Sequence, residues 1–181
     1  MIMRICERDA LIIIDMQRDF MPNGPLPVPE ADRIIPIINR YVEYFQKHGL
    51  TIVATRDWHP PNHISFRTRG GPWPPHCIMN TDGSKFHPEL KLPPSTIIVS
   101  KATDPDKEAY SAFDGTELNS ILRSRGIRRL FICGIAAEFC VKETALDALR
   151  LNYTTILLVD AIKGISEKSS KEAIEELPNK S

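Results

Sequence analysis

Short aliphatic runs alternate with segments of helical periodicity along most of this 181-residue chain. The first run is continuous and rich in isoleucine, which is typical of a strand that is covered on both faces. Strands of this kind that are joined by helices favour a parallel sheet with right-handed crossovers. We therefore predict an α/β fold of three layers (α-β-α), with a doubly wound, mostly parallel sheet of five or six strands. The predicted strands are Ala10–Ile14, Leu50–Thr55, Ser95–Ser100, Leu130–Gly134 and Thr154–Asp160.

Four segments carry apolar residues at helical spacing. In the first of them, Ile34, Ile38 and Phe45 recur on one face, and Gly49 follows as a stop signal. Pro36 is expected either to lie in the first turn of this helix, where proline is tolerated, or to kink it. The predicted helices cover residues 31–48, 115–125, 138–151 and 167–177.

The composition excludes several classes of protein. Lys and Arg number 23, as do Asp and Glu, and no local run is basic, which argues against a nucleic-acid partner. The longest uncharged apolar runs, Ala10–Ile14 and Ile156–Val159, are too short to cross a bilayer, so we expect no membrane partner. The N-terminus does not resemble an export signal, and we expect a cytoplasmic protein with reduced thiols, a disulfide being the alternative. The four cysteines are Cys6, Cys77, Cys133 and Cys140.

One long segment breaks the alternation of strands and helices. Thirteen of the fifteen prolines fall between Pro22 and Pro94, and residues 56–94 show no clear periodicity. A long irregular segment inside a compact domain is usually functional or disordered. Its two tryptophans and four histidines argue against disorder. We therefore predict a single domain over residues 1–181, with an ordered loop for metal and substrate at residues 56–94.

Polar residues follow the predicted strands. Asp15 follows the first, Asp57 and His59 the second, Lys101 the third, and Cys140 opens the helix after the fourth. Ligands of open α/β sheets bind at the carboxyl ends of the strands. The sequence therefore predicts that an acid, a cation, a thiol and potential metal ligands share one edge of the sheet.

Cys140 is the candidate nucleophile. Its position in the first turn of a helix is expected to lower the pKa of the thiol, whereas a buried, inert cysteine is the alternative, as predicted for Cys133 inside a strand. Asp15 can take the thiol proton and pass it to a leaving amine, although an aspartate that stabilises a loop is the simpler interpretation. Lys101 can compensate Asp15 and favour the thiolate, its alternative being a solvated surface lysine.

Asp57, His59 and His76 provide one carboxylate and two imidazoles. This ligand count is typical of a metal site with open positions for water or substrate. His63 is predicted either to be a further ligand or to support one. The alternative is that these are ordinary loop histidines that bond to the backbone.

Phe20 and Trp73 are aromatic residues that lie near these groups in the sequence. A flat ring can stack between two such side chains. The alternative is that both residues close a small core of the loop.

The same residues resemble a known family. Residues 13–20, 56–66, 70–77 and 134–141, with Asp-Trp-His at 57–59 and Trp-Pro-Pro-His at 73–76, closely resemble nicotinamidases of the isochorismatase-like cysteine hydrolase superfamily. Residues 100–101 and 110–115 also resemble that family, so the likeness runs from about Ala10 to Lys163.

The resemblance implies an isochorismatase-like fold and the hydrolysis of nicotinamide, and also of pyrazinamide, to the acid and ammonia in NAD salvage. It implies that Cys140 attacks the carboxamide carbon to form a thioester, that Asp15 acts as base and then acid, and that Lys101 orients the pair. It also implies that the substrate is a small pyridine carboxamide and that the chain forms a homo-oligomer.

The resemblance assigns the remaining site residues as well. A divalent metal, most often zinc, with Fe²⁺ or Mn²⁺ as alternatives, is bound by three residues, and the pyridine ring lies between two aromatic side chains. A cis peptide precedes the alanine of the oxyanion hole, where one donor is typically worth about 3–4 kcal/mol of barrier. These residues are, in order, Asp57, His59 and His76 for the metal, Phe20 and Trp73 for the ring, and the N–H groups of Ala136 and Cys140 for the oxyanion.

The chain also departs from the family pattern. Ala137 and Phe139 stand where many relatives have Thr and Tyr, which removes polar contacts near the nucleophile. Relatives commonly add an edge strand after the last helix, so the sheet is expected to have five strands, or six if that strand is present. Two other functions remain open: a related hydrolase for another amide or an N-carbamoyl compound, which needs no metal triad, and a catalytically silent binding domain.

Overall fold

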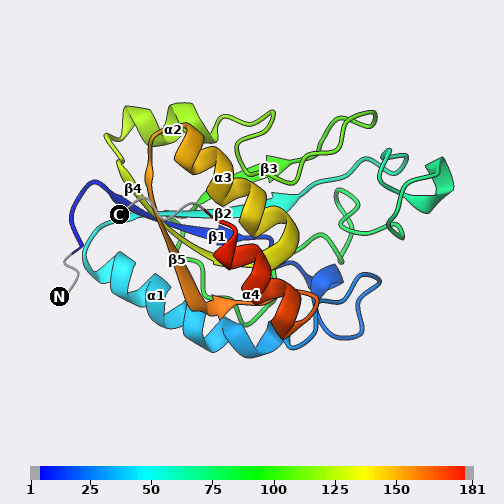
Figure 1. Ribbon diagram of the computed structural model, residues 1–181, viewed down its shortest axis with the longest axis horizontal. Helices are drawn as coiled ribbons and strands as arrows, with labels where there is room; N and C mark the ends of the chain where they lie inside the picture. The colour runs from blue at the N-terminus through cyan, green and yellow to red at the C-terminus, as the bar shows by residue number, and fades with distance from the viewer. Residues whose placement is uncertain (1–4, 178–181) are drawn as a thin grey trace.

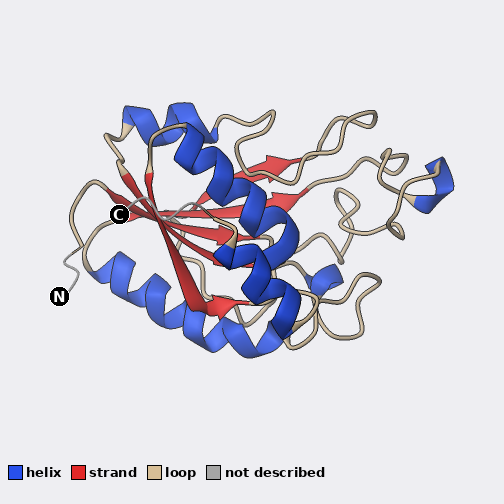
Figure 2. Cartoon of the chain, viewed as in Figure 1, coloured by secondary structure: helices blue, strands red, loops and turns tan. Residues whose placement is uncertain are grey.

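The computed structural model describes residues 5–177, and its centre is a sheet of five parallel strands in the order β3-β2-β1-β4-β5 (Figure 1). Helices cover both faces, so the predicted three-layer α/β fold is confirmed (Figure 2). The strands are β1 (Asp9–Ile14), β2 (Thr51–Asp57), β3 (Ile97–Lys101), β4 (Arg129–Gly134) and β5 (Thr154–Ile162).

The central strand β1 is buried throughout, and its side chains divide the core in two. Leu11 and Ile13 pack with helix α1 (Ile35–Lys47) on one face. Ala10 and Ile12 pack on the other face with residues of α2 (Leu118–Ser124) and α3 (Lys142–Arg150). This alternation follows from the period of two in a strand.

The helices differ from their predicted bounds mainly at the ends. A 3₁₀ turn at Ala31–Ile34 precedes α1, and Pro36 lies in the first turn of α1, where its missing N–H costs little. The predicted helix over residues 138–151 begins as a π-helical turn, Ala137–Val141, and continues as α3. Helix α4 spans Glu167–Glu175 and contacts that π-helical turn.

The segment between β2 and β3 contains no strand but is ordered by backbone hydrogen bonds. Isolated bridges join His59 to Ile78 and Phe66 to Trp73. The segment projects beyond the carboxyl ends of the strands, at the right of Figure 1. These contacts confirm that the irregular segment is ordered.

Within residues 5–177 the sheet has no sixth strand, and β5 forms its edge. The predicted last helix ends at Glu175 rather than at residue 177. All four cysteines are free, so the alternative of a disulfide is wrong. None of the helices in the described part of the chain is long and apolar enough to cross a membrane.

Candidate active site

Asp15 directly follows β1 and turns its carboxylate into the site. Its backbone adopts a left-handed conformation (φ 52°), and its N–H donates to the carbonyl of Thr55 at 3.2 Å. The hydroxyl of Thr55 donates to Asp15 Oδ1 at 2.7 Å. Asp15 Oδ2 is buried and accepts no hydrogen bond from the described residues, although Lys101 Nζ lies 2.9 Å away. One carboxylate oxygen therefore accepts the hydroxyl of Thr55, and the other forms an ion pair with Lys101.

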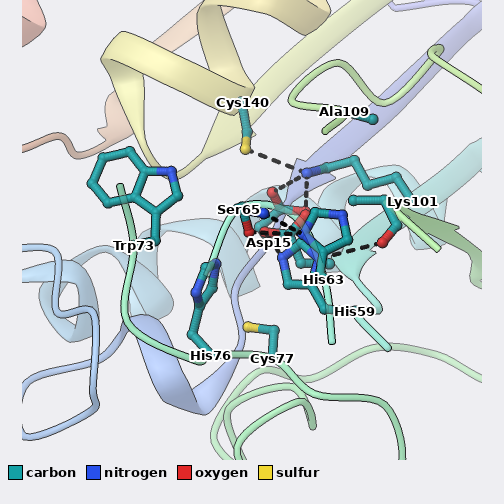
Figure 3. Close-up of polar contacts among 12 residues, drawn as sticks. Asp15, His59, His63, Ser65, Trp73, His76, Cys77, Lys101, Ala109 and Cys140 are labelled. Carbon is teal, nitrogen blue, oxygen red and sulfur yellow. Dashed lines mark hydrogen bonds and ion pairs between the residues drawn. The ribbon is translucent and has the colours of Figure 1, made fainter. Parts of the chain in front are cut away.

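The ammonium of Lys101 contacts three other polar side chains of the site. In the sheet its Cα is paired with that of Asp57, which extends β2 two residues past its predicted end. Its ammonium lies 2.5 Å from Asp57 Oδ1 and 2.9 Å from Asp15 Oδ2, and it donates to Cys140 Sγ at 3.3 Å (Figure 3). The side chain is fully buried, so the alternative of a solvated surface lysine is wrong.

Cys140 lies in the π-helical turn that opens α3, as close to a helix start as predicted. The predicted fall in its thiol pKa is wrong, however. Burial raises the pKa of Cys140 well above its ordinary value; Lys101 opposes this rise, while the charges of Asp15 and Asp57 add to it. The dipole of a helix start cannot outweigh desolvation beside two carboxylates.

The two carboxylates shift in opposite directions. Burial raises the pKa of Asp15 above 3.8; Lys101 opposes this, and the charge of Asp57 adds to it. Burial also acts to raise the pKa of Asp57, but Lys101 and the neighbouring His59, whose Nε2 lies 3.6 Å from Asp57 Oδ2, outweigh it and lower that pKa. Asp57 is therefore the permanent anion, and Asp15 is the carboxylate that can exchange a proton.

Asp57, His59 and His76 place one ligand atom each within 4.8 Å of one another, and all three are buried. His59 Nδ1 lies 3.3 Å from the carbonyl of Ala102, and His76 Nδ1 lies 2.7 Å from that of Pro74. His59 Nε2 has no hydrogen-bond partner among the described residues. Each imidazole thus donates one N–H to the backbone and keeps its other nitrogen for a metal, an arrangement that fits a divalent ion.

His63 does not share this geometry. Its Nδ1 lies 2.7 Å from Ser65 Oγ and its Nε2 lies 3.0 Å from the carbonyl of Lys107. Its ring packs against that of His59 with 4.1 Å between the centroids. Both nitrogens are engaged, so His63 supports His59 by packing rather than by sharing a ligand atom.

Sequence reasoning missed Gln17, which holds the backbone of Asp57 in place. Gln17 is fully buried, accepts from Asp57 N at 2.8 Å, and donates to the carbonyls of Asp57 and Ser84 at 2.8 and 2.9 Å. It therefore joins the ends of β1 and β2 to the long loop. A glutamine two residues after Asp15 was a weak signal, because its partners are backbone groups of distant segments.

A cavity opens beside these groups, with an empty volume of about 540 Å³ that includes its open mouth. Phe20 and Trp73 both line it, as the sequence predicts for residues that contact a ring. The indole N–H of Trp73 donates to Tyr110 Oη at 3.1 Å, and Phe139 packs edge-on against Trp73 with 5.3 Å between centroids. The side chains of Trp73, Tyr110 and Phe139 thus form one wall of the cavity. Phe139 packs in this wall although it lacks the hydroxyl of the tyrosine that many relatives have there.

Another part of the lining was not predicted from the sequence. It comes from Leu26 and Val28, in the loop after β1, and from Ile165, in the turn after β5. These residues give no periodic signal because they lie in irregular segments.

The peptide bond between Ile135 and Ala136 is cis, as the resemblance implies. Ala136 lines the cavity together with Cys140. Before this bond, Gly134 has a φ of 113°, and a Cβ there would lie 2.2 Å from the carbonyl oxygen of Ile14. Only glycine allows β4 to end so close to β1.

A model of the isochorismatase domain matches residues 9–180. A nicotinamidase of Acinetobacter baylyi is 39% identical over 183 residues, which cover 89% of this chain and 84% of that protein. The chain is thus similar to a named amidohydrolase over nearly its whole length.

Two solved structures share the fold. Pyrazinamidase of Pyrococcus horikoshii in complex with zinc is 58% identical, with a TM-score of 0.91 over 94% of both chains. PnC1 of L. infantum in complex with nicotinate is 37% identical, with a TM-score of 0.88 over 94% of this chain and 88% of that one.

Proposed function

The chain belongs to the isochorismatase family, and from this membership we propose that it hydrolyses nicotinamide to nicotinate and ammonia. The observation that carries the proposal is the buried ammonium of Lys101, which contacts a thiol and two carboxylates at the edge of a ring-sized cavity. A protein that only binds a ring has no use for this set.

The reaction starts with a proton transfer. Oδ2 of Asp15 takes the thiol proton of Cys140, and the thiolate sulfur attacks the carboxamide carbon, forming a C–S bond and a tetrahedral oxyanion. Asp15 then gives the proton to the amide nitrogen, the C–N bond breaks, and ammonia leaves a thioester on Cys140. In the second half Asp15 takes a proton from water and the hydroxide attacks the thioester carbon. The C–S bond then breaks, Asp15 returns the proton to the sulfur of Cys140, and nicotinate leaves.

Lys101 and the turn that carries Cys140 stabilise charge during these steps. The ammonium compensates the thiolate as it forms, in a buried site where an unpaired charge is costly. The N–H groups of Ala136 and Cys140 are assigned to the oxyanion, because both residues line the cavity at the reacting sulfur.

Asp57, His59 and His76 would hold a divalent metal, for which zinc is our assignment. When bound, the metal supplies a Lewis acid beside the cavity, able to ligate water or a pyridine nitrogen. The two Nδ1–H donors to backbone carbonyls fix both imidazoles with Nε2 directed to the ligand cluster.

The walls of the cavity suit a flat, neutral ring. Phe20 and Trp73 are assigned to its two faces, and pyrazinamide, which has the same shape, is a second expected substrate. We further infer a cytoplasmic enzyme of NAD salvage, which four free thiols support. The single domain over residues 1–181 and the homo-oligomer remain predictions, and sedimentation tests the latter.

The first test is ammonia release from nicotinamide by the purified protein, before and after treatment with a chelator. Turnover that the chelator abolishes and added Zn²⁺ restores is the expected result. Turnover that survives a chelator while elemental analysis shows the metal gone would remove the metal from the proposal. An absence of ammonia from reduced, metal-replete protein would overturn the nicotinamide assignment and point to another amide or an N-carbamoyl substrate.

A further inference from the structure

The turn between β5 and α4 brings an apolar side chain to the mouth of the cavity. Ile165 lines the cavity, yet 49% of its surface is exposed. A large aliphatic side chain left half exposed at the rim of a cavity is what an incoming ring covers. Ile165 therefore lies where its side chain can limit the size of the bound ring.

Glu138 holds this turn in place. Its two carboxylate oxygens accept the N–H of Ile165 at 2.9 and 3.1 Å. Oε1 also accepts from the hydroxyls of Ser169 at 2.5 Å and Ser170 at 3.2 Å, both in the first turn of α4. Glu138 lies two residues before Cys140, so one side chain links the turn of the nucleophile to the rim of the cavity.

The residues that precede Ile165 also pack closely against their neighbours. A Cβ at Gly164 would lie 2.2 Å from Glu138 Oε2 and 2.4 Å from Ser170 Oγ, so a larger residue there would displace these side chains from their present contacts. The neighbouring Lys163 is tied as well, because its carbonyl accepts from Ala137 N at 3.0 Å and its ammonium lies 2.9 Å from Glu30. The turn that carries Ile165 is therefore held by hydrogen bonds and an ion pair on both sides.

We propose that Ile165 is a specificity-determining residue that limits the substrate to a single six-membered ring, and that Glu138 is its positioning residue. The inference rests on the proposed function, which it deepens by naming the size of the ring. A bicyclic carboxamide such as quinoline-3-carboxamide is expected to react poorly because Ile165 takes up part of the cavity that a second ring could otherwise enter. Removal of the side chain, or release of the turn, opens that space.

The test compares kcat/KM for nicotinamide and quinoline-3-carboxamide in the metal-replete enzyme. In Ile165→Ala the ratio of bicyclic to monocyclic kcat/KM rises at least tenfold, and KM for nicotinamide rises more than kcat falls. Val159→Ala is the matched control, since Val159 is 62% exposed and lies outside the cavity lining. A ratio in Ile165→Ala that equals the ratio in Val159→Ala overturns the proposal.

Glu138 is tested with two variants, because loss of its carboxylate also weakens the start of α4. Glu138→Ala is expected to raise the same ratio three- to tenfold. Glu138→Gln keeps one acceptor oxygen and should restore most of the wild-type ratio. A melting temperature that falls in Glu138→Ala while the ratio stays at the wild-type value reduces Glu138 to a structural role and overturns its part of the proposal.

A binding measurement separates this inference from the proposed function. Ring binding is followed by quenching of tryptophan fluorescence, to which Trp73 in the cavity contributes. If the wild type releases no ammonia from nicotinamide but Ile165→Ala gains affinity for the bicyclic amide, the proposed function fails and the inference stands. If ammonia is released and neither binding nor turnover ratios change, the inference alone fails.

Discussion

Charged side chains are buried at both ends of the central strands, but their polar atoms are hydrogen-bonded to different extents at the two ends. At the amino end, Asp9 opens β1 and is buried, and Arg129 opens the neighbouring strand β4. Asp9 Oδ1 accepts from Arg129 Nε at 2.8 Å, and Oδ2 accepts from Arg129 Nη2 at 2.5 Å and from Cys6 N at 2.8 Å. Both oxygens are satisfied, as buried carboxylates usually are.

At the carboxyl end, charges are crowded and atoms are left open. Lys101 faces both Asp15 and Asp57, so one ammonium serves two carboxylates. Asp15 Oδ2 and His59 Nε2 lack hydrogen bonds within the described part of the chain. A buried polar atom without a hydrogen bond costs free energy, and at this edge both atoms lie beside the cavity and the ligand cluster, where a proton, a metal or a substrate can engage them. The comparison therefore separates a structural edge from a reactive one.

The strongest test of the reactive edge is Cys140→Ala, matched with Cys133→Ala. Both thiols are buried, but the thiol of Cys133 lies inside β4, where burial and the charge of Asp160 raise its pKa. Cys140→Ala should lower kcat/KM for nicotinamide at least on the order of 10⁴-fold, as removal of a nucleophile does. Cys133→Ala should keep turnover within about twofold and lose about 1 kcal/mol of unfolding free energy. Turnover by Cys140→Ala comparable to that of the wild type would exclude a thioester intermediate on Cys140.

The two edges can be compared directly with Asp15→Asn and Asp9→Asn. Asp15→Asn removes the base and should lower kcat/KM on the order of 10³-fold with the fold intact. Asp9→Asn weakens the bonds to Arg129 and should lower the unfolding free energy by about 1–3 kcal/mol with kcat/KM unchanged. Chemical denaturation and initial rates measure both effects. A folded Asp9→Asn protein with tenfold lower kcat/KM would break the distinction between the edges.

Metal binding provides the next largest effect. Asp57→Ala and His76→Ala should each lose stoichiometric metal in elemental analysis. They should also lower kcat/KM roughly 100-fold or more, since loss of even the partners of metal ligands typically costs 10- to 100-fold. The control is His87→Ala, a histidine of the same loop that lies outside the cavity lining. Variants of Asp57 and His76 that retain the metal would show that the ligand set is wrong.

The sequence predicted the reactive edge because hydrophobic periodicity locates strand ends, and parallel strands bring their carboxyl ends together. It did not predict that β2 runs on past Thr55, because Arg56 and Asp57 carry no aliphatic signal although both pair with β3. The direction of the pKa shift of Cys140 was wrong because burial among carboxylates depends on tertiary packing. Gln17 and Glu138 were missed as site residues for a similar reason, since their partners lie in distant segments.

The acid limb of the pH profile gives a smaller and sharper test. Asp15 must be ionised to take the proton of Cys140, so kcat/KM falls as the pH falls through the pKa of Asp15. Because burial raises that pKa, with Lys101 opposing and Asp57 adding, the midpoint should lie above the ordinary value of 3.8. Metal content measured at each pH separates this titration from metal loss. A midpoint at or below 3.8 in metal-replete protein would contradict the role of Asp15.

The smallest expected effect comes from the one hydroxyl that bonds to Asp15. Thr55 donates to Asp15 Oδ1, and this hydrogen bond lowers the pKa of the carboxyl against the larger effect of burial. Thr55→Val keeps the shape but removes the donor, so the acid limb should move to higher pH and kcat/KM at neutral pH should fall about 3- to 10-fold, the worth of a hydrogen bond to a charged group. Thr55→Ser keeps the hydroxyl and should hold the wild-type limb. If valine and serine shift the limb equally, the carboxylate is positioned by packing and by its contact with Lys101.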